Sequence, residues 1–181
     1  MDKSISTKLN IYADLLLSYN RVHNISGVKS LKEVNTNIED SLAPLSWVGS
    51  LGKVCIDVGS GAGFPALPLA ISSPDVEFHL FEPIAKKSSF LHLVKVELGL
   101  SGVHIHTSRI EDFTPFFADT ITSRAVTNVS ALVALVRPFI GSSTQLLLYK
   151  GSHAHEETKG FKNVDIVTKG DRRYVVIKDI L

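Results

Sequence analysis

Cysteine is almost absent from this sequence: Cys55 is the single one among 181 residues. One cysteine can form no intramolecular disulfide and cannot supply a cysteine-rich metal cluster, which favours a reducing compartment. The chain also has no run of about 18 apolar residues, which a transmembrane helix would need. Its first residues, MDKSISTKLN, lack the apolar centre of a signal peptide. We therefore expect a cytoplasmic protein that does not associate with a membrane.

The sequence also has no excess of charge of either sign. The formal net charge is +1, with 44% hydrophobic and 20% charged residues, as in an ordinary globular protein. This balance does not mark a nucleic-acid-binding protein, although it leaves room for a local basic face. A length of 181 residues favours one hydrophobic core, so we expect residues 1–181 to form a single domain and the protein to be a monomer.

The chain divides into a helical N-terminal part and a longer part with a different rhythm. Apolar residues recur at helical spacing over residues 4–19 and 32–48, which predicts a helical N-terminal extension within residues 1–50. From residue 53 onward short β-rich runs alternate with helix-like runs, so residues 53–181 are expected to form the core. The predicted strands are KVCIDV (53–58), VEFHLFE (76–82), VHIHTS (103–108), DTITSR (119–124), TQLLLY (144–149), VDIVTK (164–169) and RYVVIKDI (173–180).

Helix-like runs separate the first five strands, over residues 65–72, 84–98 and 126–139, with an ill-defined turn near 111–117. An alternation of strands and helices predicts a mostly parallel sheet with helices on both faces. Only GDRR lies between the last two strands, which is too short for a crossover and predicts an antiparallel hairpin. The expected fold is therefore α/β, with a mostly parallel seven-stranded sheet, an antiparallel C-terminal hairpin and a helical N-terminal extension.

Ligands of such sheets bind at the carboxyl ends of the strands, where the strand order reverses. Asp57 lies near the end of the first predicted strand, which leads into three glycines, Gly59, Gly61 and Gly63. Glycine permits positive φ and lets a ligand approach the bare backbone. The helix expected next begins with unpaired amide donors. A plain strand-to-helix turn would need only one such glycine, so the loop predicts a binding site.

The residues around this loop favour a nucleoside over a dinucleotide. The dinucleotide fingerprint G-x-G-x-x-G/A requires a small third residue for close packing, and Phe64 stands there instead. Glu82 follows the second strand, where a carboxylate can accept hydrogen bonds from ribose hydroxyls; a solvated strand end is the alternative. A nucleoside without phosphates suits these residues. S-adenosylmethionine is the commonest such cofactor, and its positive sulfonium is compatible with a nearby Asp57.

The sequence resembles a known family over most of its length. The segments DVGSGAGFPALPLAI (57–71), FEPIAKKSSFLHLVKVELGL (81–100), SRIED (108–112), TSRAV (122–126), LYKG (148–151) and RRYVVIKD (172–179) look like the glucose-inhibited division protein B family, in order. The upstream segments YADLLLSYNRVHNISG and NIEDSLAPL are similar to its helical N-terminus. Members of that family are bacterial methyltransferases that form N7-methylguanosine in small-subunit ribosomal RNA. The resemblance implies a class I (Rossmann-like) methyltransferase fold, S-adenosylmethionine as cofactor, and 16S ribosomal RNA or the small ribosomal subunit as partner.

The resemblance also implies roles for individual residues. Arg124 in TSRAV matches an arginine near the substrate guanine, and Lys150 in LYKG matches a lysine at the pocket mouth, so both are expected catalytic residues. Two departures are Asn37, where the family often has histidine, and Ala66, where it often has glycine. The expected cofactor-binding residues are Asp57, Gly59, Gly61, Gly63, Phe64, Glu82, Pro83, Ile84, Ile110, Glu111 and Arg124.

The implied target atom simplifies the chemistry. Guanine N7 carries a lone pair and no proton, so its methylation needs no general base, only placement of the reactants and exclusion of water. Arginine or lysine is the usual partner of the N7 and O6 edge. Because N7 must stay free, we expect Arg124 or Lys150 to contact O6 or a phosphate. The alternatives are a structural ion pair of Arg124 with Asp57 or Glu111, and a solvated strand end for Lys150.

Two histidines raise the question of a metal ion. His104 and His106 alternate on one predicted strand and share a face, yet the sequence reveals no third ligand, so no metal site is expected. Three functions stay open. They are an RNA guanine-N7 methyltransferase, which the motifs favour, a class I methyltransferase for a small molecule or protein, and a non-catalytic module that binds S-adenosylmethionine.

Overall fold

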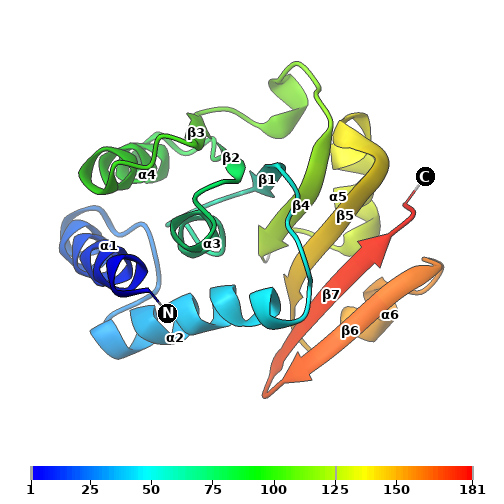
Figure 1. The fold of residues 1–181 in the computed structure, drawn as a ribbon, viewed down its shortest axis with the longest axis horizontal. Helices are drawn as coiled ribbons and strands as arrows, with labels where there is room; N and C mark the ends of the chain where they lie inside the picture. The colour runs from blue at the N-terminus through cyan, green and yellow to red at the C-terminus, as the bar shows by residue number, and fades with distance from the viewer. Residues whose placement is uncertain (1, 125, 181) are drawn as a thin grey trace.

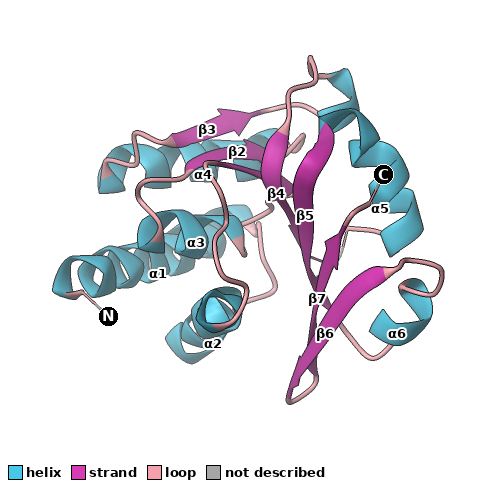
Figure 2. Cartoon of the chain, turned by 45° about the vertical axis from the view of Figure 1, so that its right-hand side comes forward, coloured by secondary structure: helices cyan, strands magenta, loops and turns pink. Residues whose placement is uncertain are grey.

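The computed structural model describes residues 2–124 and 126–180. A seven-stranded sheet runs through this part of the chain in the order β3-β2-β1-β4-β5-β7-β6 (Figures 1 and 2). The strands β1 to β5 pair in parallel, and β7 pairs antiparallel with β5 and β6, which confirms the predicted topology. The strands are β1 (Val54–Val58), β2 (Glu77–Phe81), β3 (Val103–His106), β4 (Ala118–Arg124), β5 (Ile140–Lys150), β6 (Asn163–Lys169) and β7 (Arg172–Lys178).

Helices cover both faces of this sheet. The helices are α1 (Lys3–His23), α2 (Leu31–Leu42), α3 (Ala66–Ser72), α4 (Ala85–Leu98), α5 (Val129–Val136) and α6 (Ala154–Glu157). Three short 3-10 turns are η1 (Ala43–Ser46), η2 (Ile110–Asp112) and η3 (Arg137–Phe139). Figure 1 shows α1 to α4 on one side of the sheet and α5 and α6 on the other. None of the helices in the described ranges has the length and apolarity to cross a membrane.

Side chains at the helix ends explain where several helices begin and stop. Asp2 accepts a hydrogen bond from the Ser4 amide at the start of α1, and Asn128 accepts one from Ala131 at the start of α5. Helix α4 ends at Gly99, whose φ of +61° is the left-handed conformation that closes many helices. These capping residues determine where the helices begin and end, whereas the apolar periodicity of the sequence determines the helical segments between the caps.

Two helices differ from their predicted extents because of proline and capping. The run predicted as one helix over residues 32–48 splits into α2 and η1. Pro44 has no amide hydrogen with which to continue the α-helical ladder, so the chain tightens into a 3-10 turn. The helix predicted over 126–139 begins only at Val129, after its Asn128 cap, and becomes η3 near Pro138. The short helix α6 was not predicted.

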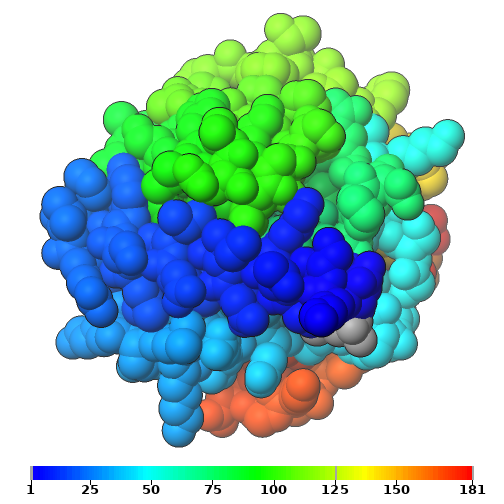
Figure 3. Space-filling view, turned by 60° about the vertical axis from the view of Figure 1, so that its left-hand side comes forward, coloured from blue at the N-terminus to red at the C-terminus, as the bar shows by residue number. Residues whose placement is uncertain are grey.

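The sheet separates two apolar cores. One core joins α1 to α4 to the face of the sheet that includes Cys55, Phe78 and Leu80, and Cys55 is fully buried there. The other joins α5 and α6 to the opposite face, which includes Ile56 and Phe81. Figure 3 shows the N-terminal segment as a blue band across the molecule, with α4 above it and α2 below. The N-terminal helices therefore share a core with the strands that they cover.

Tyr12 is the clearest link between α1 and the glycine loop. Its side chain is fully buried, and its hydroxyl donates a hydrogen bond of 2.8 Å to the Ala62 carbonyl. Its ring packs edge to face on Phe64, with the ring centroids 5.5 Å apart. Helix α1 thus contacts and stabilises the loop that follows β1.

We predict that Tyr12→Phe lowers the free energy of unfolding by about 1–3 kcal/mol, because the buried Ala62 carbonyl loses its donor. Tyr19→Phe is the matched control. The Tyr19 hydroxyl also donates to a backbone carbonyl, that of Lys86 at 3.2 Å, but at an exposed position where water can replace it. Urea denaturation of both variants measures the difference, and equal losses would contradict the role assigned to Tyr12.

Candidate functional site

A cavity of about 410 Å³ opens where the loops after β1, β2 and β4 meet. The strand order reverses between β1 and β4, so the cavity lies at the position where sheets of this kind bind ligands. A loop that follows α1 closes one side of it. The predicted cofactor-binding residues that line this cavity are Gly59, Gly61, Phe64, Glu82, Pro83, Ile84 and Arg124.

A second, narrower cavity of about 140 Å³ adjoins the first. Gly59, Pro83 and Val126 line both cavities, so the two lie side by side at the carboxyl end of β1. Ile110 and Glu111, two of the expected cofactor-binding residues, line the narrower one. The two cavities together offer a wider polar compartment beside a smaller compartment with apolar walls, as a nucleoside with a polar tail requires.

The glycines of the loop have different tasks. Gly59, Gly61 and Gly63 all have positive φ, at +72°, +58° and +101°. A Cβ on Gly63 would lie 2.4 Å from the Leu67 side chain, so Gly63 serves the packing of the loop on α3 rather than the cavity. A Cβ on Gly61 would meet only the Gly59 carbonyl, at 3.8 Å. The bare backbone at Gly61 therefore borders open space within the cavity.

Glu82 joins the loops that follow β1 and β2. Its side chain is only 3% exposed. One carboxylate oxygen accepts a hydrogen bond of 2.8 Å from the Gly61 amide, and the other accepts one of 2.8 Å from the Ile84 amide. Each oxygen has a second lone pair free to accept another donor. The carboxylate is thus oriented by the backbone, and it is no solvated strand end.

One wall of the cavity comes from a loop for which no role was predicted. Ile25 and Ser26 line the cavity, and both of their amides donate 2.8 Å hydrogen bonds to the side-chain oxygen of Asn20. The Asn20 amide group donates in turn to the carbonyls of Ser26 and Val28. A polar loop that begins with asparagine was visible in the sequence, but its position over the glycine loop follows only from the packing of α1.

Arg124 is held on three sides. Its guanidinium lies 4.9 Å from the centre of the Phe64 ring, donates a 2.8 Å hydrogen bond to the Asn37 side-chain oxygen, and lies 3.7 Å from the Asp40 carboxylate. Burial lowers the pKa of Arg124, and the Asp40 charge opposes that effect. Among the described residues, the ion-pair partner of Arg124 is Asp40, and not Asp57 or Glu111, which were the alternatives considered from the sequence. Asn37, a departure from the family pattern, orients the arginine.

Lys150 has a different environment from the one expected. It is only 8% exposed, and its ammonium group donates 2.6 Å and 2.8 Å hydrogen bonds to the Thr127 carbonyl and the Glu157 carboxylate. Lys150 is therefore neither a solvated strand end nor at the mouth of the cavity. Glu157 also accepts from the Val129 amide, so the pair connects β5, α6 and the start of α5. This carboxylate is at the end of the unpredicted helix α6.

Asp57 lies beneath the glycine loop, outside the lining of both cavities. One of its oxygens accepts a 2.6 Å hydrogen bond from Thr122, and the other, although buried, has no hydrogen-bond partner among the described residues. Burial raises the pKa of Asp57 from 3.8 to about 6. A buried, ionised carboxylate with one oxygen that lacks a hydrogen-bond partner destabilises the folded chain at neutral pH.

The sequence matches known proteins along almost its whole length. The profile of the family GidB, described as "rRNA small subunit methyltransferase G", matches residues 5–179. The ribosomal RNA small subunit methyltransferase G of Wolinella succinogenes is 43% identical over 174 residues, which cover 96% of this chain and 90% of that protein. The protein of the same name from Helicobacter bizzozeronii is 45% identical over 152 residues, which cover 83% and 84%.

Solved structures agree on the fold. A putative S-adenosyl-L-methionine-dependent methyltransferase of Methanococcus maripaludis superposes with a TM-score of 0.64, 13% identity, and coverage of 99% of this chain and 95% of that one. A precorrin-6y C5,15-methyltransferase of Geobacter metallireducens superposes with a TM-score of 0.57, 16% identity, and coverage of 84% and 92%. The fold is therefore that of the class I S-adenosylmethionine-dependent methyltransferases, as expected.

The raised pKa of Asp57 predicts a pH-dependent contribution to stability. The folded carboxyl holds its proton more tightly than the unfolded one does, so its stabilising contribution is full below about pH 4 and is lost as the pH rises through about 6. The gap between the two pKa values corresponds to on the order of 3 kcal/mol. We predict that Asp57→Asn, which carries no charge at any pH, gains stability relative to the native chain between pH 4 and pH 7.

Thermal unfolding over this pH range measures the effect. The exposed Asp75 provides the matched control, because Asp75→Asn should leave the pH profile of the native chain unchanged. A difference between Asp57→Asn and the native chain that stays constant from pH 4 to pH 7 would contradict the assignment.

Proposed function

The chain belongs to the rRNA small subunit methyltransferase G family, and we propose that it transfers a methyl group from S-adenosylmethionine to N7 of a guanine in 16S ribosomal RNA. Family membership supports the enzyme class, the cofactor and the RNA. The position of the target atom rests on the resemblance of the motifs to a family that forms N7-methylguanosine. Activity as a monomer in the cytoplasm, on naked RNA or on the small subunit, belongs to the same proposal.

The residues at the two cavities fit this cofactor. The backbone at Gly61 borders open space that a side chain would fill, and the Glu82 oxygens have lone pairs to spare for ribose hydroxyls. Ile110 is 2% exposed and contributes an apolar wall to the narrower cavity, which suits an adenine ring. When bound, S-adenosylmethionine supplies an electrophilic methyl group on a positively charged sulfur. The single observation that carries the proposal is the Glu82 carboxylate, which lines the wider cavity and is aligned by two backbone amides.

Arg124 is the residue that we place between cofactor and substrate. It lines the cofactor cavity, while its partners Asn37 and Asp40 line a separate cleft of about 400 Å³ between α2 and the hairpin of β6 and β7. A guanine that enters from this side would approach the guanidinium beside Asn37 and Asp40. Arginine is the usual partner of guanine O6, and a fixed positive charge there stabilises a base that becomes cationic.

No side chain of the described residues is required as a general base in this scheme. Guanine N7 has no proton to lose, so the chain's task is to align the reactants and to exclude water. The contacts of Arg124 with Phe64, Asn37 and Asp40 provide that alignment without any proton transfer. Lys150, which was expected to share the task, is paired with Glu157, and we assign it a positioning role.

Lys87 replaces Lys150 as the residue proposed to contact the RNA backbone. It lines the cofactor cavity from α4 and is partly exposed. The adjacent Lys86 is occupied, because its ammonium group donates to the carbonyls of His23 and Asn24 at the end of α1. Lys87 is therefore the better placed of the two for a phosphate, and phosphate contacts by lysine determine affinity and salt dependence.

We predict that the purified protein converts one guanine of unmodified 16S ribosomal RNA to N7-methylguanosine, as measured by mass spectrometry of digested nucleosides. In single-turnover reactions with saturating RNA and cofactor, Arg124→Ala should react about a hundredfold more slowly, because a positioned charge is lost. Lys87→Ala should react at the native rate once RNA is saturating. Its RNA affinity should fall, and the slope of log affinity against log salt should decrease by about 0.7–0.9.

The exposed Arg137, on η3, provides the control. Arg137→Ala should change neither the single-turnover rate nor the RNA affinity and its salt dependence. Transfer to a small molecule or to a protein but not to RNA would favour a different substrate class. Cofactor binding without any transfer would favour a non-catalytic module. A native rate for Arg124→Ala at saturating RNA would restrict this residue to a structural role.

A further inference from the structure

A cluster of polar side chains lies on the sheet, apart from the cavities described above. Glu77 and His79 are on β2, and His104 and His106 are on the neighbouring edge strand β3. His79 pairs directly with His104 across the two strands, so alternate residues of both strands bring all four side chains to one face. This is the face that α5 covers farther along the sheet, and Phe113 and Phe116 border the cluster there.

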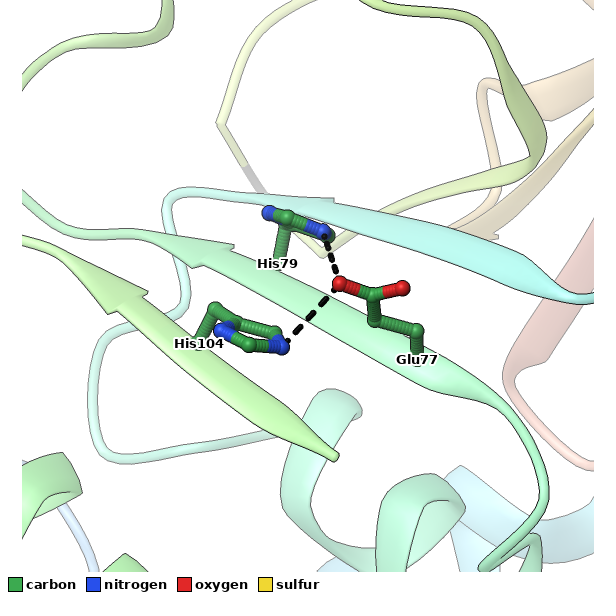
Figure 4. A group of neighbouring side chains, drawn as sticks. All are labelled: Glu77, His79 and His104. Atoms are coloured by element: carbon green, nitrogen blue, oxygen red, sulfur yellow. Dashed lines mark hydrogen bonds and ion pairs between the residues drawn. The ribbon is translucent and has the colours of Figure 1, made fainter. Parts of the chain in front are cut away.

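The Glu77 carboxylate lies between the two imidazoles. One of its oxygens is 3.1 Å from Nε2 of His79 and 3.1 Å from Nε2 of His104 (Figure 4). The ligand-type atoms of the three residues all lie within 4.8 Å of one another. The sequence suggested His104 and His106 as a pair without a third ligand. The strand pairing instead supplies His79 and Glu77 to His104.

This arrangement matches the donor set and the spacing of a transition-metal site. Zinc binds imidazole nitrogen and carboxylate oxygen at about 2.0–2.2 Å, which places neighbouring donors of a tetrahedron about 3.3 Å apart. The observed 3.1 Å spacings come close to that value before any side chain moves. Two histidines and one glutamate are also a known zinc set that leaves a fourth position open to water. Glu77 and His104 are nearly half exposed, so an ion can reach them from solvent.

His106 supports the ligand His79 through a hydrogen bond and is not itself one of the three ligands. Its Nε2 lies 3.0 Å from Nδ1 of His79. A histidine that binds a metal through one ring nitrogen normally donates a hydrogen bond from the other, which fixes its tautomer and its orientation. Here the Nδ1 proton of His79 would be donated to His106, and Nε2 of His79 would be left free to face Glu77 and His104.

We propose that Glu77, His79 and His104 bind one divalent transition-metal ion, with zinc as the fitting occupant and a water in the fourth position. The ion would cross-link the edge strand β3 to β2, because two ligands come from one strand and one from the other. The carboxyl end of β3 leads to the cofactor cavity, and the His106 carbonyl accepts a 3.1 Å hydrogen bond from the Glu82 amide. The site would therefore stiffen the sheet edge beside Glu82 without contact with the reacting groups.

Isothermal titration calorimetry with zinc chloride, on protein treated with a chelator and then desalted, tests this proposal without a methylation assay. The native chain should bind one equivalent at micromolar concentration or below, and zinc should raise its thermal unfolding midpoint. His106→Ala, which leaves all three ligands in place but removes the supporting hydrogen bond and the packing of its ring on Phe81 and Phe113, should weaken binding about ten- to a hundredfold. Glu77→Gln and His104→Ala, which each remove a ligand, should weaken it further and abolish the thermal shift.

His153→Ala is the matched control. His153 lies 3.5 Å from Glu156 on an exposed turn, so it represents an ordinary surface histidine beside a carboxylate. This variant should bind zinc as the native chain does. Circular dichroism shows whether each variant is folded before titration. No saturable uptake of one equivalent by the native chain would overturn the proposal, and so would native affinity in folded His104→Ala.

Discussion

The carboxylate of Glu82 is the constraint on which the site depends. It is almost completely buried, and it joins the backbone of the glycine loop after β1 to the backbone after β2. A buried charge of this kind is stable only when donors surround it, so the two loops must keep the positions that supply their amides. The same two loops form the floor of both cavities. One hydrogen-bonded side chain thus couples the shape of the site to its chemistry.

The N-terminal helices complete this site rather than extend a finished core. Tyr12 holds the glycine loop from beneath, Asn20 fixes the loop that closes the cavity, and Asn37 with Asp40 holds the arginine at its far end. Each contact joins the helical part to a loop at the carboxyl ends of the strands. The helical part and the strand part of the chain therefore act together, although only the strand part carries the motifs of a cofactor-binding sheet.

The sequence predicted what depends on local patterns and missed what depends on long-range hydrogen bonds. Apolar strands separated by helix-like runs gave the sheet and its hairpin, and the glycine loop with Glu82 located the cavity. The partners of Arg124 were not identified, because Asn37 is 87 positions away from it and Asp40 lies on the same helix α2, which has no apparent link to β4 in the sequence. The burial of Lys150 was missed because its partner Glu157 belongs to a helix of only four residues, too short for a periodic signal. The histidine cluster was missed because it requires the register of two strands.

The central claim is that Glu82 recognises the ribose of the cofactor in addition to holding the loops. The most direct test is the dissociation constant of S-adenosylhomocysteine and of its 2′-deoxy and 3′-deoxy analogues, for the native chain and for Glu82→Gln, with the exposed Glu97→Gln as control. The native chain and the control should prefer the complete ribose about ten- to a hundredfold, as expected for a hydrogen bond to a charged group worth about 1.5–3 kcal/mol. Folded Glu82→Gln should lose most of this preference. If it bound all three ligands more weakly but kept the native preference for the hydroxyls, Glu82 would shape the loops only, and the account of ribose recognition would be wrong.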